Sequence, residues 1–342
     1  SFQRRHMIPQ IGINSIAMCS CGEGCGHASR KMGKTDMLGE EHVYGRSTNA
    51  RTWTDGSSGH DVGIWRDGTA WSPRGRDITE AQAETILNAV LDAGINYLDT
   101  SIDYGLSEEC IGRYISDRRS SYYLASKCGC LVGAPPAPRG QRSPHVFTRD
   151  NIMADVEQSL ARLKTDYLDV LRFHASPSRQ TLETVPALKR AGTVRFIGMS
   201  STLPHLPDHI AMGVFDIFQI PYSAVEREHE AITTAAADAG AGIVIRGGAA
   251  KGAPSEGKQA GAQWERWQKA RLDDLLEGMT PMEFILRFTF THPDMDTNIV
   301  GTMNPAHLQD NINALLKGPL PPELYAEAKR HLAAVGSGSR GL

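Results

Sequence analysis

Four residues whose side chains could transfer protons or donate hydrogen bonds follow predicted β-strands in the middle of the chain: Asp99, Tyr104, Lys127 and His174. Asp99 follows the apolar run 95–98, and Tyr104 stands five residues later, on a short polar loop. Active sites of βα-barrels lie at the C-terminal ends of the strands, so these residues are expected to share one face. A lone lysine or histidine at a strand end is usually solvated or packed. The joint occurrence therefore predicts a catalytic site.

The local sequences Asp99-Thr-Ser-Ile-Asp-Tyr104-Gly, Ala-Ser-Lys127-Cys-Gly and Leu-Arg-Phe-His174-Ala-Ser-Pro resemble the aldo-keto reductase family, and the resemblance covers about residues 79–318. It implies an NAD(P)-dependent oxidoreductase that reduces a carbonyl, in an aldehyde, ketone or sugar, to an alcohol. Hydride would pass between C4 of a nicotinamide and the carbonyl carbon. Tyr104 would be the general acid in reduction and the base in alcohol oxidation, and His174 would donate a hydrogen bond to the substrate oxygen.

A free phenol has a pKa of about 10 and is a slow acid at neutral pH. A nearby ammonium group on Lys127 favours the phenolate and would lower the pKa of Tyr104. Asp99 would pair with Lys127 and keep it charged. The sequence therefore predicts one cooperating group of side chains.

The resemblance also implies a cofactor site. Residues at the ends of two later strands would hold the nicotinamide carboxamide; these are Ser200, Ser201 and Gln219. Arg246 stands where the family has a stacking aromatic, and Gly247 and Gly248 begin the implied pyrophosphate loop. Glycine allows the backbone to approach a phosphate closely. A guanidinium over the ring would disfavour the positively charged oxidised nicotinamide, so we expect preference for the reduced cofactor.

The adenosine end of the cofactor is implied to lie along the last strand and helix of the barrel. The residues concerned are Gly301, Met303, His307, Asp310 and Asn311. Many NADPH-specific members carry Lys and Arg where this chain has Gly301 and His307. We favour NADPH as the cofactor because it is the commoner one in the family, and NADH is the alternative.

The elements that would position these residues alternate regularly after residue 79. Strands are expected at 95–98, 122–126, 167–173, 194–199, 214–220, 242–245 and 297–300. Helices are expected at 79–93, from Ser107 as its capping residue, and at 148–163, 179–191, 227–238, 280–291, 305–316 and 323–334. Such alternation predicts a parallel sheet. With a first strand at 11–14 or 42–46, the fold is an α/β (β/α)8 TIM barrel with eight parallel strands.

Three segments are expected along the chain: an irregular N-terminal segment, 1–78, the barrel, 79–335, and a flexible tail, 336–342. The tail contains Gly336-x-Gly338-x-x-Gly341. That pattern has no strand before it and no helix after it, so it is not a dinucleotide fingerprint.

The chain has 342 residues, of which 40% are hydrophobic and 22% are charged, and its net charge is −3. These values are typical of a globular protein. The charge favours neither nucleic-acid nor membrane-surface binding. No apolar run reaches the ~18 residues that a membrane helix needs. The run 7–18 after Arg4-Arg5-His6 faintly resembles a leader, but polar residues and Pro9 interrupt it. The six cysteines form no disulfide framework, so we expect a cytoplasmic protein.

A short cluster near the N-terminus, Cys19-x-Cys21-x₃-Cys25-x-His27, contains four possible metal ligands. Its spacing lacks the usual Cys-x₂₋₄-Cys pairs separated by a longer loop. We favour a Cys/Gly-rich tail over a zinc site and expect no metal.

The substrate pocket is expected between the loops 129–147 and 250–279, with the N-terminal segment as a further candidate wall. Trp264 and Trp267 in the second loop either stack on a sugar or aromatic substrate or pack that loop against the barrel. The partner is expected to be a small carbonyl or alcohol, whose identity the sequence leaves open, as it does the oligomeric state. The alternative function is an NAD(P)(H)-binding regulatory or redox-sensing subunit with little turnover, as in channel β subunits that resemble this fold.

Overall fold

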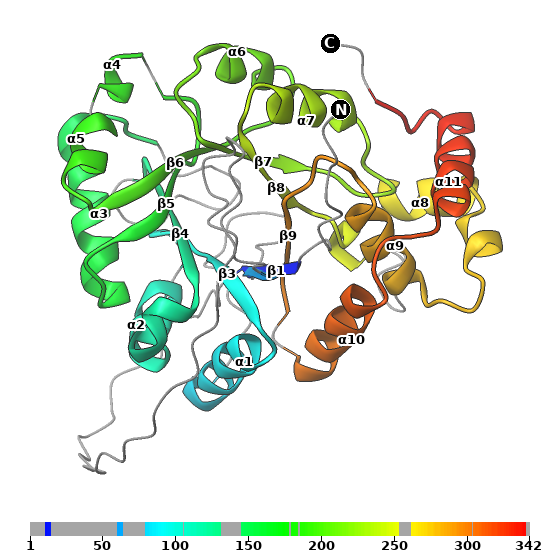
Figure 1. Cartoon of the computed structure of the whole chain (residues 1–342), viewed down its shortest axis with the longest axis horizontal. Helices are drawn as coiled ribbons and strands as arrows, with labels where there is room; N and C mark the ends of the chain where they lie inside the picture. The colour runs from blue at the N-terminus through cyan, green and yellow to red at the C-terminus, as the bar shows by residue number, and fades with distance from the viewer. Residues whose placement is uncertain are drawn as a thin grey trace, which may run out of the picture.

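The computed structural model describes residues 11–14, 60–63, 79–104, 106–130, 145–177, 179–183, 185–252, 261–302 and 304–339. Within them, seven parallel strands stand side by side in chain order, surrounded by helices (Figure 1). These strands are β3 (Ile95–Asp99), β4 (Tyr123–Cys128), β5 (Leu168–Phe173), β6 (Val194–Ser200), β7 (Ile217–Pro221), β8 (Gly242–Arg246) and β9 (Thr297–Val300). The predicted parallel βα-barrel is confirmed.

Two short N-terminal strands complete the sheet. Strand β1 (Ile11–Asn14) pairs in parallel with β9 on one side and β3 on the other, and so closes the ring. It is one of the two segments considered as the first strand; the other, 42–46, lies outside the described residues. Strand β2 (His60–Gly63), which the sequence did not predict, also pairs in parallel with β3.

The helices lie between successive strands and on the outside of the barrel (Figure 1). They are α1 (Glu80–Asp92), α2 (Ser107–Tyr114), α3 (Arg149–Leu163), α4 (Arg179–Leu182), α5 (Val185–Arg190), α6 (Leu206–Ala211), α7 (Glu230–Asp238), α8 (Ala262–Lys269), α9 (Pro281–Phe290), α10 (Pro305–Leu316) and α11 (Pro322–Ala334). Short 3₁₀ turns are η1 (Ser116–Ser121), η2 (Ala250–Gly252) and η3 (Leu272–Leu275).

Local sequence explains where helix α1 begins and ends. The Thr79 hydroxyl accepts from the backbone N–H of Gln82, and the Gln82 side chain accepts from the Thr79 N–H, which makes a capping box. After the helix, Gly94 has a φ of 80°, a conformation that glycine adopts without the strain of a side chain. Between these signals, the residues at helical spacing are buried.

The structure differs from the expected elements at three places. The predicted helix 179–191 is divided into α4 and α5, and a helix absent from the prediction, α6, lies between β6 and β7. Ser107 does not cap α2: the N-cap is Leu106, and the buried Ser107 hydroxyl lies 2.7 Å from that of Thr100. Ser107 was predicted as the N-cap because serine is common at that position, but its hydroxyl is hydrogen-bonded to Thr100 instead.

The inside of the barrel holds a compact ring of side chains, roughly one from each strand. Its buried members are Tyr97, Ala125, Val170, Ile217, Val244 and Ile299. Because side chains alternate between the two faces of a strand, the residue two positions further along points into the same interior, nearer the C-terminal end. That next layer contains the candidate site.

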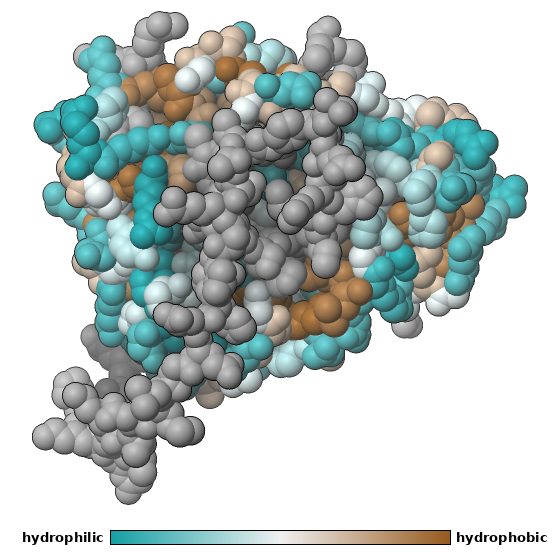
Figure 2. Space-filling model, viewed as in Figure 1, coloured by the Kyte–Doolittle hydropathy of each residue, from teal (hydrophilic) through white to brown (hydrophobic). Residues whose placement is uncertain are grey.

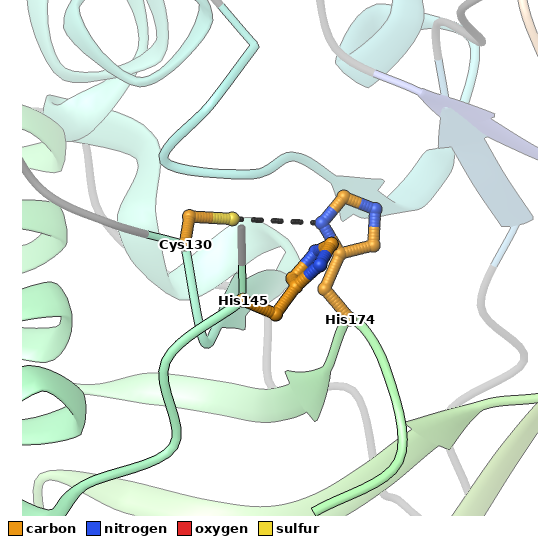
Figure 3. A group of neighbouring side chains, drawn as sticks. All are labelled: Cys130, His145 and His174. Atoms are coloured by element: carbon orange, nitrogen blue, oxygen red, sulfur yellow. Dashed lines mark hydrogen bonds between the residues drawn. The ribbon is translucent and has the colours of Figure 1, made fainter. Parts of the chain in front are cut away.

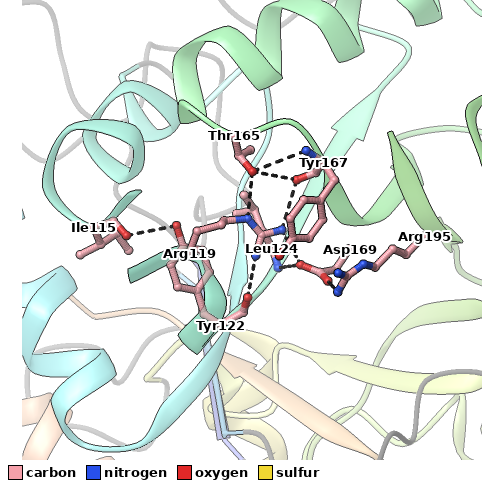
Figure 4. Close-up of polar contacts among 8 residues, drawn as sticks. All are labelled: Ile115, Arg119, Tyr122, Leu124, Thr165, Tyr167, Asp169 and Arg195. Carbon is pink, nitrogen blue, oxygen red and sulfur yellow. Dashed lines mark hydrogen bonds and ion pairs between the residues drawn. The ribbon is translucent and has the colours of Figure 1, made fainter. Parts of the chain in front are cut away.

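The opposite end of the barrel is held by Asp169 at the start of β5 (Figure 4). Its two oxygens pair with Arg119 at 2.6 Å and Arg195 at 2.8 Å, and it also accepts from the backbone N–H of Leu124 at 2.8 Å. The two guanidinium groups lie 3.9 and 4.2 Å from the centre of the Tyr167 ring. These contacts join β4, β5 and β6.

The insert and the C-terminal tail pack against the barrel. Trp267 is fully buried, donates to Asp273 at 3.0 Å, and meets the Phe284 ring edge-on, so it has the packing role rather than a substrate-stacking one. In the tail, the buried Ser337 accepts through its carbonyl from Arg227 at 3.1 Å. Ser337 and Ser339 of the tail therefore contact residues of the barrel.

On the face shown in Figure 2, hydrophobic areas are interspersed with hydrophilic ones. Among the described residues, the large hydrophobic side chains left exposed are Leu106, Val214 and Leu316, which lie far apart in the chain. None of the described helices combines the length and apolar character needed to cross a membrane.

Candidate active site

The polar layer above the inner ring is formed by residues two positions beyond members of that ring. Its members are Asp99, Lys127, Arg172, Gln219 and Arg246. They come from strands β3, β4, β5, β7 and β8 at or near their C-terminal ends. The barrel register therefore brings together side chains that are up to 147 positions apart in the chain.

Asp99 is the shared acceptor of this layer. Its Oδ1 accepts from Lys127 Nζ at 2.5 Å, and its Oδ2 accepts from Gln219 Nε2 at 2.6 Å and pairs with Arg172. Lys127 also donates to the Thr100 carbonyl at 2.7 Å. The side chains of Asp99, Lys127 and Arg172 are 1%, 2% and 0% exposed, so these charges interact with little screening by water.

A tight turn carries Tyr104 back over the end of β3. The Tyr104 N–H donates to the Ser101 carbonyl at 3.0 Å, and Arg162 on α3 donates to the carbonyl of Ile102 inside the turn at 3.0 Å. Lys127 Nζ consequently lies 4.4 Å from the centre of the Tyr104 ring, within the range of a cation–π contact.

His174 follows directly after β5, and its ring lies edge-on to that of Tyr104, with 6.3 Å between the centres. Its Nδ1 is 3.5 Å from Cys130 Sγ and 3.8 Å from an oxygen of Asp103. Asp103 is itself held by the Ser101 hydroxyl at 2.5 Å. The four predicted residues Asp99, Tyr104, Lys127 and His174 thus lie together; we call them the mouth cluster.

Burial shapes the pKa values of the mouth cluster. It would raise the pKa of Asp99, but the cations Arg172 and Lys127 outweigh it and lower that pKa. Burial, aided by Arg172, lowers the pKa of Lys127 against the opposing effect of Asp99. Burial also lowers the pKa of His174 to about 4, which leaves the ring neutral at pH 7.

Tyr104 departs from the sequence-based expectation. Burial raises its pKa well above 10, and the carboxylates of Asp99 and Asp103 add to that effect; among the leading influences only Arg172 lowers it. We expected Lys127 to lower the pKa of Tyr104, but burial has the larger effect. A phenol with a raised pKa keeps its proton at neutral pH and is available as a donor.

The residues expected at the nicotinamide end adjoin the mouth cluster. The Ser200 hydroxyl donates to Gln219 Oε1 at 3.0 Å, and the same amide donates to Asp99. Ser201 is differently engaged: its buried hydroxyl lies 2.7 Å from His209 Nδ1 on α6. Ser200 and Gln219 are thus connected to Asp99, whereas the Ser201 side chain contacts a helix.

Arg246 is the last residue of β8. Burial lowers the pKa of its guanidinium group, and the nearby groups Glu226, Tyr104 and Asp99 oppose that effect. After it, Gly247 has a φ of 75° and open space around the position of a Cβ, with a Glu226 oxygen 3.9 Å away. Gly248 has no such space, since a Cβ would come within 2.3 Å of Asn298. The backbone at Gly247 fits close approach of a ligand, although Glu226 places a carboxylate nearby.

The residues expected at the adenosine end lie after β9. Gly301, His307 and Asp310 are exposed there, whereas Asn311 is buried on the inner side of α10. Met303 lies outside the described residues, as do Cys19, Cys21, Cys25 and His27 of the N-terminal cysteine cluster. None of these adenosine-end residues belongs to the mouth cluster.

Sequence reasoning missed Arg172, although it is fully buried and paired with Asp99. Its Cγ fills the space that a side chain on Gly198 of the neighbouring strand would need, since a Cβ there would come within 2.5 Å. The available signal was an arginine near the end of a strand whose other residues, apart from Asp169, are apolar, because arginine is almost never fully buried unless paired.

Comparison with known proteins identifies the family of the chain. The Aldo/keto reductase family model matches residues 62–333. Aldo-keto reductase YhdN of Bacillus subtilis (strain 168) is 27% identical over 321 residues, covering 79% of this chain and 94% of that protein. The uncharacterized oxidoreductase YqkF of the same organism is 28% identical over 254 residues, covering 68% and 82%.

Among solved structures, the holo form of aldo-keto reductase AKR11C1 from Bacillus halodurans superposes with a TM-score of 0.66 at 26% identity, over 74% of this chain and 88% of that one. The chain belongs to the aldo/keto reductase family of oxidoreductases.

Proposed function

We propose that the protein reduces the carbonyl group of a small aldehyde, ketone or sugar to an alcohol with NAD(P)H. The observation that carries the proposal is the mouth cluster: a buried Asp99–Lys127 pair beneath the Tyr104 ring, with His174 at the edge of that ring. Together they offer a proton donor, a fixed positive charge and a second hydrogen-bond donor at the end of the barrel where such sites form.

In the proposed reaction Tyr104 gives its proton to the carbonyl oxygen, and in alcohol oxidation it takes that proton back. Lys127 lies against the Tyr104 ring, so its charge stabilises negative charge that develops on the phenol oxygen as the proton leaves. Asp99 holds Lys127 in place. Neutral His174 donates a hydrogen bond to the substrate oxygen and orients it.

The nicotinamide cofactor, when bound, supplies the hydride. The residues proposed to hold its carboxamide are Ser200, Ser201 and Gln219, and the backbone at Gly247 and Gly248 is proposed to face the phosphates. The polar chain from Ser200 through Gln219 to Asp99 supports a position of the nicotinamide beside Tyr104. The proposed adenosine contacts are Gly301, Met303, His307, Asp310 and Asn311. NADPH is favoured, with NADH as the alternative.

The first test is a titration of the full chain with NADPH and, separately, NADH, followed by protein fluorescence, and then a turnover assay with a panel of aldehydes, ketones and sugars. We expect tight binding of one reduced cofactor and measurable turnover. Binding without turnover of any panel compound would favour the regulatory subunit. Binding of neither cofactor would refute the proposal.

Tyr104→Phe separates the roles of binding and proton transfer. We expect it to lower kcat by roughly 10²–10⁴-fold, the usual contribution of a positioned acid. The Kd for the cofactor should stay within about twofold, because the ring and its contact with Lys127 remain. Full activity of this variant would remove Tyr104 from the mechanism.

Arg246 gives a prediction about the redox state of the cofactor. Its charge beside the mouth cluster should weaken binding of the oxidised, positively charged nicotinamide relative to the reduced one. The dissociation constants of both forms are to be compared in the native chain and in Arg246→Met. Equal constants in the native chain would contradict the assignment.

A further inference from the structure

A group of three potential metal ligands lies beside the mouth cluster, formed by Cys130, His145 and His174. The donor atoms of the three side chains all lie within 4.8 Å of one another. Figure 3 shows the side chains converging from three segments: the residues after β4, the segment that leads into α3, and the residue after β5. We propose that these three residues form a binding site for a divalent metal ion of the zinc class.

The distances fit that ion. Tetrahedral zinc binds sulfur at about 2.3 Å and imidazole nitrogen at about 2.0–2.1 Å, so neighbouring sulfur and nitrogen ligands lie about 3.6 Å apart. Cys130 Sγ and His174 Nδ1 are already 3.5 Å apart. The third donor, on His145, lies within 4.8 Å of both of these atoms. The mixed thiolate and imidazole set favours zinc over the oxygen-preferring magnesium and calcium.

A fourth ligand is within reach. An oxygen of Asp103 lies 3.8 Å from His174 Nδ1 and accepts a hydrogen bond from the Ser101 hydroxyl. A carboxylate is an accepted zinc ligand, and the hydrogen bond from the Ser101 hydroxyl would orient it. Water could take the same position.

The backbone that carries two of the ligands is clamped. The Asn151 side chain on α3 donates to the carbonyls of Cys130 and Val146, each at 2.9 Å. Cys130 and His145 also form an antiparallel bridge. Both ligand-bearing segments are therefore fixed by contacts independent of any metal, so little conformational freedom is lost when an ion binds.

The test uses Co²⁺ as the probe, because a tetrahedral cobalt–thiolate site has d–d bands in the visible and a sulfur-to-cobalt charge-transfer band in the near ultraviolet. The N-terminal cysteines could bind cobalt independently. The titration is therefore made on a full-length chain carrying Cys19→Ser, Cys21→Ser and Cys25→Ser. We expect one Co²⁺ per chain with both sets of bands, and displacement of Co²⁺ by Zn²⁺.

In that background, Cys130→Ser should abolish the charge-transfer band, and His145→Asn should weaken Co²⁺ binding by more than the ~10-fold that even loss of an outer-shell partner can cost. Cys110→Ser, which changes another buried cysteine on α2, is the matched control and should leave the spectrum unchanged. Circular dichroism checks that each variant is folded. Absence of a cobalt–thiolate band in the background chain, or its persistence in folded Cys130→Ser, would overturn the proposal.

Discussion

Replacing Asp99 with asparagine would remove a carboxylate that faces two buried cations, Lys127 and Arg172. The amide keeps the shape and can still accept from Gln219, but the charges of Lys127 and Arg172 are left uncompensated. Removing one partner of a buried ion pair costs about 3–5 kcal/mol. Since domains are stable by only about 5–15 kcal/mol, this single change should bring the protein near its stability limit.

Asp169→Asn is the matched control, because Asp169 is equally buried and also holds two cations and one N–H donor. Its cations are better solvated: the side chain of Arg195 is 52% exposed and that of Arg119 is 12% exposed. Water can solvate them when the carboxylate is lost. The expected cost is therefore about 1.5–3 kcal/mol, typical of hydrogen bonds to a charged group.

Urea unfolding followed by circular dichroism measures the loss of unfolding free energy in both variants. The comparison holds if the m-value, the slope of that free energy with urea concentration, stays unchanged. The double variant Asp99→Asn/Arg172→Met should recover part of the loss, with a coupling energy of about 0.5–3 kcal/mol, because one buried unpaired cation is gone. If Asp99→Asn costs no more than Asp169→Asn, or if the double variant is simply additive, the reasoning from buried charge is wrong.

Two further predictions concern stability. Gly198→Ala should destabilise the protein by about 1–3 kcal/mol, because the added methyl overlaps the buried Arg172 side chain, whereas Gly338→Ala, where nothing lies within 4 Å, should change stability little; urea unfolding of both variants would show it. Burial would raise the pKa of Glu230, but Lys329 and Arg227 outweigh it and lower that pKa, so its contribution to stability is present above the unfolded pKa of about 4.3 and is lost as pH falls through the lower folded pKa. The native chain should therefore be more stable than Glu230→Gln above the unfolded pKa of about 4.3, and this difference in unfolding free energy should shrink as the pH falls below that value. A difference that grew on acidification would contradict a lowered pKa of Glu230.

Much of the barrel could be predicted because its signals are local. Apolar runs of strand length alternate with segments of helical periodicity, and such alternation is compatible with few folds other than a parallel sheet covered by helices. The capping residue Thr79 and the glycine at 94 mark a helix by chemistry contained within a few residues. The mouth-cluster residues were predicted for the same reason, since each lies at the end of a strand or on the loop that follows it.

What the sequence could not determine depends on contacts between residues far apart in the chain. Gln219 reaches Asp99 across 120 positions, and Arg172 fills the space left by Gly198 on the next strand; no local pattern encodes either contact. Burial, rather than the charge of Lys127, dominates the pKa of Tyr104, and burial is a property of the closed barrel. The sequence by itself determined which groups stand at the strand ends, and only the tertiary structure decided which of them pair and how dry their surroundings are.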